Sequence, residues 1–148
     1  MSELQLVNDR LEALIGSLSA PARKEMARTI AKKLRASQQQ NIKRQQAPDG
    51  TPFKPRKVQA RNKKGRIKRE MFAKLRTAKY LKLNGTADDA IVEFTGNVQR
   101  MARVHHYGLR DRPVRGGKEV QYKARRLLGF NDELTQLINK VIIFHMCE

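Results

Sequence analysis

The chain has 148 residues, of which 39% are hydrophobic and 31% charged, and its formal net charge is +18. That length favours one domain, residues 1–148, over two. A single cysteine, Cys147, excludes an internal disulfide, and the lack of an apolar run of about 18 residues excludes a membrane-spanning helix.

The positive charge is concentrated in one part of the sequence. Residues 1–22 carry one base and three acids, residues 23–79 carry 20 bases and three acids, and residues 80–148 carry 11 bases and eight acids. The middle segment therefore holds a net +17 of the total +18. Such a block attracts an acidic partner, which is nucleic acid, an anionic membrane or an acidic protein surface.

The first third of the chain predicts two helices. Apolar residues at three- and four-residue steps predict one helix over about residues 3–17 and another over about residues 20–45. Ser19 is a good N-cap for the second, and Pro21 suits its first turn. The first apolar stripe is Leu4, Val7, Leu11, Leu14, Ile15 and Leu18, and the second is Met26, Ala27, Ile30, Ala31, Leu34 and Ile42. We expect these stripes to pack against each other and a core.

Residues 46–66 have no apolar period and contain three of the five prolines. An irregular segment of this length inside a compact domain is usually functional or disordered. A short helix is expected to follow over about residues 68–77, with Met71, Phe72 and Leu75 pointing inward.

The period then changes to two, which predicts a β-hairpin of about residues 79–84 and 90–95. A helix over about residues 98–107, with Met101, Ala102 and Val104 buried, would end at Gly108 as its C-cap. Residues 109–118 read as a loop and 119–123 as a strand. The last helix begins near Asn131, with a stripe of Leu134, Leu137, Ile138, Val141, Ile142 and His145. These elements predict an α+β fold: an N-terminal helical hairpin, an extended basic arm, a small antiparallel sheet with a short helix, and a C-terminal helix.

The sequence offers few groups for catalysis. His105 and His106 are adjacent, so on a helix they point about 100° apart and cannot hold one ion from one face. Cys147 cannot complete a zinc site, and neither a phosphate-binding loop nor a dinucleotide fingerprint is present. The pair Asp88 and Asp89 suits the tip of the hairpin. We therefore expect no enzyme, no cofactor, no metal and no small-molecule substrate.

A basic arm, residues 46–69, gives the strongest purely physical signal. Its bases are Lys54, Arg56, Lys57, Arg61, Lys63, Lys64, Arg66, Lys68 and Arg69, with no acid among residues 54–69. Facing phosphates, such a segment would release counterions and bind with steep salt dependence. Phe53 is its sole aromatic residue, which gives little support to a base-stacking surface. Charge leaves three readings open: a polyanion such as DNA, an acidic protein surface, or plain solvation. A membrane is disfavoured because the bases do not line the polar face of an amphipathic helix.

Four motifs in order resemble the phage virion morphogenesis family. They are SQQQNIKRQQAPDGTPFKPRK (37–57), KKGRIKREMFAKLRTAKYLKL (63–83), VHHYGL (104–109) and YKARRLLGF (122–130). Each motif is weak evidence by itself, but their order and spacing argue against a chance match. The resemblance covers nearly the whole chain. The sequence departs from the family's pattern at His106, where Gln is usual, and at Arg126, where Pro is usual.

The resemblance implies a structural role in the virion. Such proteins complete the assembled tail at its neck and prepare it to join the head, as a homo-oligomeric ring for which a hexamer is one expectation. The implied partners are other copies, other tail proteins and head-completion proteins, with DNA passing through the lumen as a further contact. The implied location is the virion tail and neck, and the host cytoplasm during assembly. The alternative function is nucleic-acid binding through residues 54–69.

The residues that the resemblance carries over fall in three stretches. They are Gln45, Pro48, Asp49, Gly50, Thr51 and Pro52, with neighbouring Phe53; His105 and Gly108; and Tyr122, Ala124, Arg125, Leu128, Gly129 and Phe130. Residues 48–50 favour a turn, since proline fixes φ and Gly50 can adopt positive φ. Gly129 suits a corner between a strand and a helix. Arg125, in an apolar strand-like setting, is the best candidate for a specific ion pair, within the chain or across a subunit boundary.

Overall fold

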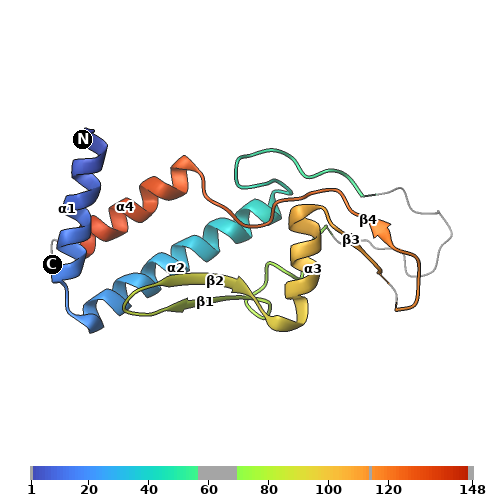
Figure 1. Ribbon diagram of the computed structural model, residues 1–148, viewed down its shortest axis with the longest axis horizontal. Coiled ribbons are helices and arrows are strands. Elements are labelled where there is room, and N and C mark those ends of the chain that lie inside the picture. Colours follow the sequence, from blue (N-terminus) through green and yellow to red (C-terminus); the bar gives the residue numbers. More distant parts are fainter. Residues whose placement is uncertain (1, 57–69, 114, 147–148) are drawn as a thin grey trace. The chain divides into compact units, whose positions relative to one another are not determined.

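The computed structural model describes residues 2–56, 70–113 and 115–146. In chain order its elements are α1 (Glu3–Ser17), α2 (Ala20–Lys43), β1 (Leu81–Gly85), β2 (Ala90–Phe94), α3 (Gly96–Tyr107), β3 (Arg110–Asp111), β4 (Val120–Gln121) and α4 (Asp132–Met146) (Figure 1). Both sheets have two antiparallel strands. The α+β class predicted from the sequence is therefore confirmed.

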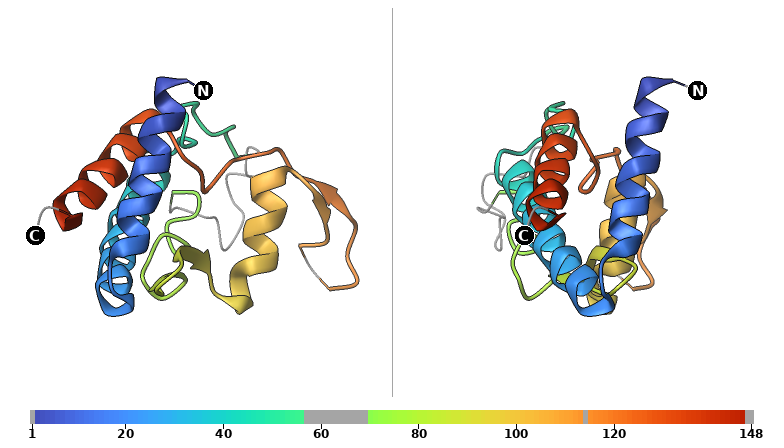
Figure 2. Two further views of the ribbon diagram at one scale, coloured as in Figure 1. Left: turned by 60° about the vertical axis from the view of Figure 1, so that its left-hand side comes forward. Right: turned by 90° about the vertical axis from the view of Figure 1, so that its left-hand side faces the viewer.

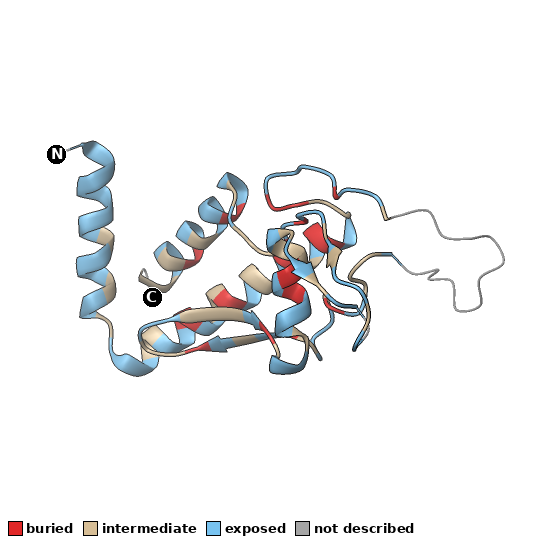
Figure 3. Cartoon of the chain, turned by 45° about the vertical axis from the view of Figure 1, so that its right-hand side comes forward, coloured by how far each residue is buried: buried red, intermediate tan, exposed pale blue. Residues whose placement is uncertain are grey.

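The chain forms two compact units, and each is discontinuous in sequence. The first comprises residues 1–35, 83–92 and 132–148, and the second comprises residues 36–82 and 93–131. Each has its own buried residues (Figure 3). The expectation of one domain over residues 1–148 stays a prediction.

The first unit has a small apolar core between α2 and α4. Its buried side chains are Met26, Ala27, Ala31, Leu134 and Val141. Gly85 lies so close to α2 that a Cβ there would come within 2.6 Å of the backbone nitrogen of Arg28. Arg23 ties the start of α2 to the hairpin tip, because its Nε donates to the carbonyl oxygen of Ala87 at 3.1 Å. The hairpin tip thus packs on α2 with almost no space between their backbones.

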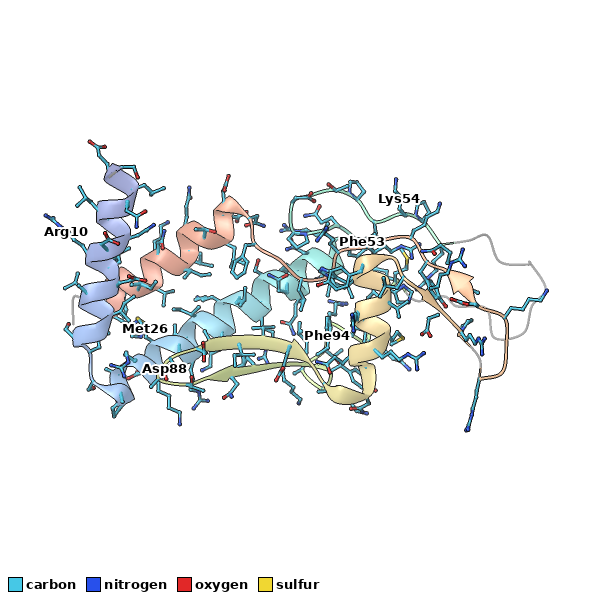
Figure 4. The ribbon with its side chains drawn as sticks, viewed as in Figure 1. Arg10, Met26, Phe53, Lys54, Asp88 and Phe94 are labelled. Carbon is cyan, nitrogen blue, oxygen red and sulfur yellow. The ribbon has the colours of Figure 1, made fainter. Side chains whose placement is uncertain are left out.

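The hairpin closes through the hydroxyl of Thr86. Its Oγ1 accepts hydrogen bonds from the backbone N–H groups of Asp88 and Asp89 at 3.2 and 2.9 Å. This is the local side-chain-to-backbone bonding that favours threonine in turns. Strands β1 and β2 lie side by side in both views of Figure 2, and Asp88 is at the tip in Figure 4. The predicted hairpin is confirmed with shorter strands.

The second unit is built on the end of α2, on α3 and on irregular segments. Its buried apolar residues are Ile42, Ala47, Phe53, Leu75, Leu81, Phe94, Ala102, Val104 and Leu127, and its buried polar residues are Gln38, Asn41 and Arg125. Gly108 ends α3 with φ of 68°, the left-handed C-cap expected from the sequence. The chain continues into the β3–β4 pair, in which Arg110 faces Gln121 and Asp111 faces Val120.

Several expectations about local structure are wrong. Residues 71–80 form successive turns instead of a helix, because Phe72 adopts a φ of 63°, which a right-handed helix excludes. Residues 68 and 69 of that expected helix lie outside the described residues. Met101 was expected to be buried but is 46% exposed, and the expected loop 109–118 contains β3.

Helix α1 was expected to pack through its apolar stripe, and this too is wrong. None of its described residues is buried, and Leu4, Val7 and Leu14 are 71, 53 and 51% exposed. Figure 3 shows α1 in the colours of exposed and intermediate residues. Only Leu11 and Ile15 in the helix reach intermediate burial. The amphipathic period correctly predicts a helix, but it does not say which surface covers its apolar face.

Candidate assembly site around the base of the basic arm

The segment after α2, residues 45–53, folds back on itself in a tight hydrogen-bonded turn. The N–H of Gly50 donates to the carbonyl oxygen of Ala47 at 2.9 Å, and the N–H of Ala47 donates to that of Thr51 at 2.8 Å. Gly50 adopts a φ of 90°, as its place after Pro48 and Asp49 predicts. The carboxylate of Asp49 accepts from the N–H of Thr51 at 2.9 Å, and this bond lowers the pKa of Asp49. The predicted turn is confirmed.

Gln45 closes this turn. It adopts a φ of 55°, which few non-glycine residues do, and its carbonyl oxygen accepts from the N–H of Phe53 at 2.8 Å. Its side-chain Nε2 donates to the carbonyl oxygens of Ile42 and Met71, at 2.9 and 2.8 Å. One residue therefore ends α2, returns the chain and fixes the segment beyond residue 70.

Arg125 holds the point where the described part of the arm begins. Its Nε donates to the carbonyl oxygen of Lys54 at 2.7 Å, and its Nη2 donates to that of Pro55 at 2.9 Å. The backbone N–H of Arg125 also donates to the carbonyl oxygen of His105 at 2.8 Å. Only 8% of the residue is exposed, and burial, followed by the charge of Arg56, lowers the pKa of the guanidinium. The contacts supplied by the described residues are carbonyl oxygens, and the predicted ion pair stays a prediction.

Gly129 is the second fastening point. Gln38, only 1% exposed, donates from Nε2 to the carbonyl oxygen of Gly129 at 2.7 Å and accepts at Oε1 from its N–H at 3.1 Å. A Cβ on Gly129 would lie 3.0 Å from the Cγ atom of Pro48. Asn131 donates from Nδ2 to the carbonyl oxygen of Pro48 at 2.8 Å. The corner before α4 is thus pressed onto the first motif by contacts that a larger residue would disturb.

Gly108 connects the motifs VHHYGL (104–109) and YKARRLLGF (122–130). A Cβ there would come within 2.6 Å of the backbone nitrogen of Ala124, so only glycine permits this approach. The neighbouring N–H of Tyr122 donates to the carbonyl oxygen of Leu109 at 3.1 Å, and Gln121 donates from Nε2 to that of Gly108 at 2.6 Å. The C-cap of α3 and the strand after it therefore share one close-packed backbone contact.

Four rings form a row between these segments. Phe53 and Phe72 meet edge to face at 5.7 Å, Phe72 and His105 at 5.1 Å, and His105 and Tyr122 at 4.7 Å between ring centroids. Edge-to-face pairs at such distances stabilise a core beyond the area that they bury. Figure 4 labels Phe53 and its neighbour Lys54 on the segment that enters this row. The single aromatic residue of the arm is therefore part of the core instead of a free stacking surface.

Both histidines of the VHHYGL motif, His105 and His106, favour the neutral form. Burial, then the nearby charge of Arg125, lowers the pKa of His105, whose buried Nδ1 has no hydrogen-bond partner among the described residues. Burial, then the charge of Arg126, lowers the pKa of His106. The Nδ1 atom of His106 accepts from the backbone N–H of Leu127 at 3.1 Å. Because protonation of Nδ1 would remove this acceptor, the bond requires a neutral ring.

A groove of about 1020 Å³ opens in this unit beside the ring row. Its apolar lining includes Met71, Phe72, Leu75, Val98, Met101 and Tyr122. Lys74 and Lys123 also line it, and both are exposed. Glu70 is the one acid in the lining and is also exposed, so the groove is mainly apolar with a small excess of positive charge. Among the described residues no group of three or more metal-ligating side chains could hold an ion.

The structure brings together most of the site residues proposed from the sequence. Gln45, residues 48–53, His105, Gly108, Arg125 and Gly129 all belong to the contacts above. Leu128 is of intermediate burial, and Phe130 is 66% exposed. Of the basic arm, Lys54 and Arg56 are described, while Lys57, Arg61, Lys63, Lys64, Arg66, Lys68 and Arg69 lie outside the described residues.

Sequence reasoning missed several contributors. Gln38, His106 and Asn131 each fasten a motif through a side chain, and Phe72 completes the ring row. The glutamines at 38–40 gave one usable signal, because a polar residue in register with the apolar stripe of a helix indicates a buried hydrogen bond.

Comparisons with known proteins identify the family of the chain. The model of the phage virion morphogenesis family matches residues 2–146. The chain is 43% identical over 148 residues to the tail completion protein S of Escherichia phage P2, and the match covers 99% of each chain. No solved structure matches. No helix among the described residues is long and apolar enough to cross a membrane. A family match over almost the full length, with the motif residues gathered in one unit, shows that the chain belongs to the phage virion morphogenesis family.

Proposed function

We propose that this chain is a structural tail completion protein. It caps the assembled phage tail at the neck, prepares the tail for joining to the head, and acts there as a homo-oligomeric ring. The observation that carries this function is the 43% identity over the full length to a protein named for tail completion. The site supports a binding role, since its residues hold backbone segments together and leave an apolar groove open.

The site also suggests how the chain would work. The turn at residues 45–53 precedes Lys54 and Pro55, and the side chain of Arg125 holds both residues by their backbone carbonyl groups. The basic arm would therefore leave the unit from a fixed point and reach a neighbouring subunit or another tail protein. Because residues 54 and 55 are already held in place, docking would not have to order them.

In vitro complementation tests this function. A lysate of the phage carrying a stop codon in the gene for this chain should contain heads and tails that remain separate under the electron microscope. Adding the purified chain should produce joined, infectious particles. The matched control is the heat-unfolded chain. If the lysate without the chain already contains joined particles, tail completion is not its function.

The charge of residues 23–79 favours nucleic-acid binding as a second candidate. In that case the chain should bind duplex or single-stranded DNA in the micromolar range at physiological salt, and the affinity should fall steeply as salt rises. Replacing Arg61, Lys63, Lys64 and Arg66 by Gln should abolish binding. A variant that keeps its DNA affinity contradicts this candidate, and one that loses particle assembly at unchanged affinity supports the first.

A further inference from the structure

One helix of the first unit presents an apolar face that the described residues do not cover. Leu4, Val7 and Leu14 recur at spacings of three and seven residues, so they share one side of α1. They are 71, 53 and 51% exposed. Glu3, Asp9 and Glu12 make the same helix acidic in a chain of net charge +18. The helix is therefore an acidic amphipathic ligand in its physical character.

The groove of the second unit has the opposite character. Its walls come from the turns at residues 70–75, from α3 and from residues 120–125. Apolar side chains form most of the lining, and the exposed Lys74 and Lys123 outweigh the one exposed acid in it, Glu70. Its volume of about 1020 Å³ lies at the upper end of the range of about 300–1,000 Å³ typical of ligand pockets. Met101 in its wall is 46% exposed, which is unusual for a methionine and typical of adaptable binding surfaces.

We propose that α1 of one copy docks into this groove of the next copy. The two surfaces match in kind, because an apolar helical stripe meets an apolar groove, and the acid Glu3 beside the stripe meets lysines beside the groove. Laying the apolar face of a helix into a groove is a common mode of recognition, with anchors at spacings such as i, i+3 and i+7. The inference rests on the proposed ring and names the contact that would build it.

The consequence is a head-to-tail interface. Each copy offers one helix and one groove, so every contact uses two different surfaces. Interfaces of this type generate closed rings when the rotation between copies closes, whereas a symmetric contact would stop at a dimer. The charged rim should steer the helix and make assembly weaken with salt, while the apolar anchors should supply most of the affinity.

Mixing two defective variants tests the contact in the full chain. The helix variant carries Val7→Gln and Leu14→Gln, and the groove variant carries Met101→Glu. All three side chains are exposed, so both variants should fold. Losing two buried anchors should weaken self-association by at least about 100-fold. The matched control is Ala13→Gln, an exposed position on the other side of α1, which should assemble like the wild type.

Native mass spectrometry should find oligomers of the wild type and monomers of each variant. An equimolar mixture of the two variants should form heterodimers that grow no further, because it retains one intact helix and one intact groove per pair. The inference is overturned if the helix variant assembles like the wild type, or if the mixture stays monomeric. It is also overturned if the wild type is a monomer at about 100 µM, far above a micromolar Kd. Tail completion is decided separately by the complementation of lysates, so the two can fail independently.

Discussion

The two units of this chain satisfy their surfaces in different ways. In the second unit, segments 70 or more residues apart are joined by buried polar side chains: Gln38 to Gly129, and Arg125 to Lys54 and Pro55. In the first unit, α1 has no buried residue among those described, and on α4 Ile143 and Phe144 are 53 and 64% exposed. The second unit joins distant segments through buried polar contacts, whereas the first unit exposes apolar side chains on two of its helices.

This difference separates two jobs within one small protein. Buried hydrogen bonds between distant segments specify one arrangement, and removing one partner costs the full desolvation of the group left behind. Exposed apolar residues specify nothing until a partner arrives, but they mark interaction surfaces. We therefore expect substitutions at the buried polar contacts of the second unit to change stability and those on α1 to change assembly.

The largest loss is expected from Arg125→Met. The change removes the donors of the partly buried carbonyl oxygens of Lys54 and Pro55 and replaces a buried guanidinium, which should lower the free energy of unfolding by about 3 kcal/mol. Urea unfolding followed by circular dichroism measures it. The matched control is Arg126→Met, the exposed next residue, which should cost less than about 0.5 kcal/mol. Equal losses in the two variants, or a loss as large in the α1 variant, would remove the contrast between the units.

A somewhat smaller loss is expected from Gly108→Ala. Its φ of 68° disfavours any side chain by about 1–2 kcal/mol, and the Cβ would meet the backbone of Ala124 at 2.6 Å. The total should be about 2–3 kcal/mol. Gly116 separates the two causes, since its φ is 76° but nothing lies within 4 Å of a Cβ there. Gly116→Ala should show the conformational cost alone, and if the two variants unfold together, the approach to Ala124 has no energetic weight.

The smallest effect is a dependence on pH. His105 and His106 have a lowered pKa in the folded state, so protons bind the unfolded chain more readily below the ordinary value of 6.5. Their contribution to stability is present above that value and is lost as the pH falls through it. Thermal unfolding should thus occur at a lower temperature at about pH 5.5 than at about pH 7.5.

His106→Gln should flatten this dependence, because the amide oxygen can accept from the N–H of Leu127 at either pH. His106→Leu is the comparison, since it removes the acceptor as well as the titration and should be less stable at both pH values. A glutamine variant with the same slope as the wild type would mean that the titration of His106 does not affect folding.

Regular periods made the helices and the hairpin predictable. The stripe of α2, the cap at Gly108 and the turn at Gly50 follow from spacing and from backbone preferences that act over a few residues. The helix expected at residues 68–77 failed for a physical reason. Phe72 adopts positive φ while its ring packs between Phe53 and His105, so tertiary contacts override local propensity.

The candidate site was predictable only in part. The resemblance named Arg125 and Gly129 without their partners, and no local pattern says that Arg125 reaches the carbonyl of a residue 71 positions away. The exposure of α1 was equally hidden, because an amphipathic period is the same whether the covering surface belongs to this chain or to another.

The grip of Arg125 on Lys54 and Pro55 uses only main-chain oxygen atoms. A carbonyl group is the same in every residue, so this grip does not depend on which side chains the segment carries. The side chain of Lys54 can therefore be exchanged without loss of either hydrogen bond. For protein engineering, residues 54 and 55 therefore serve as a fixed attachment point, after which segments of other charge or length can be grafted.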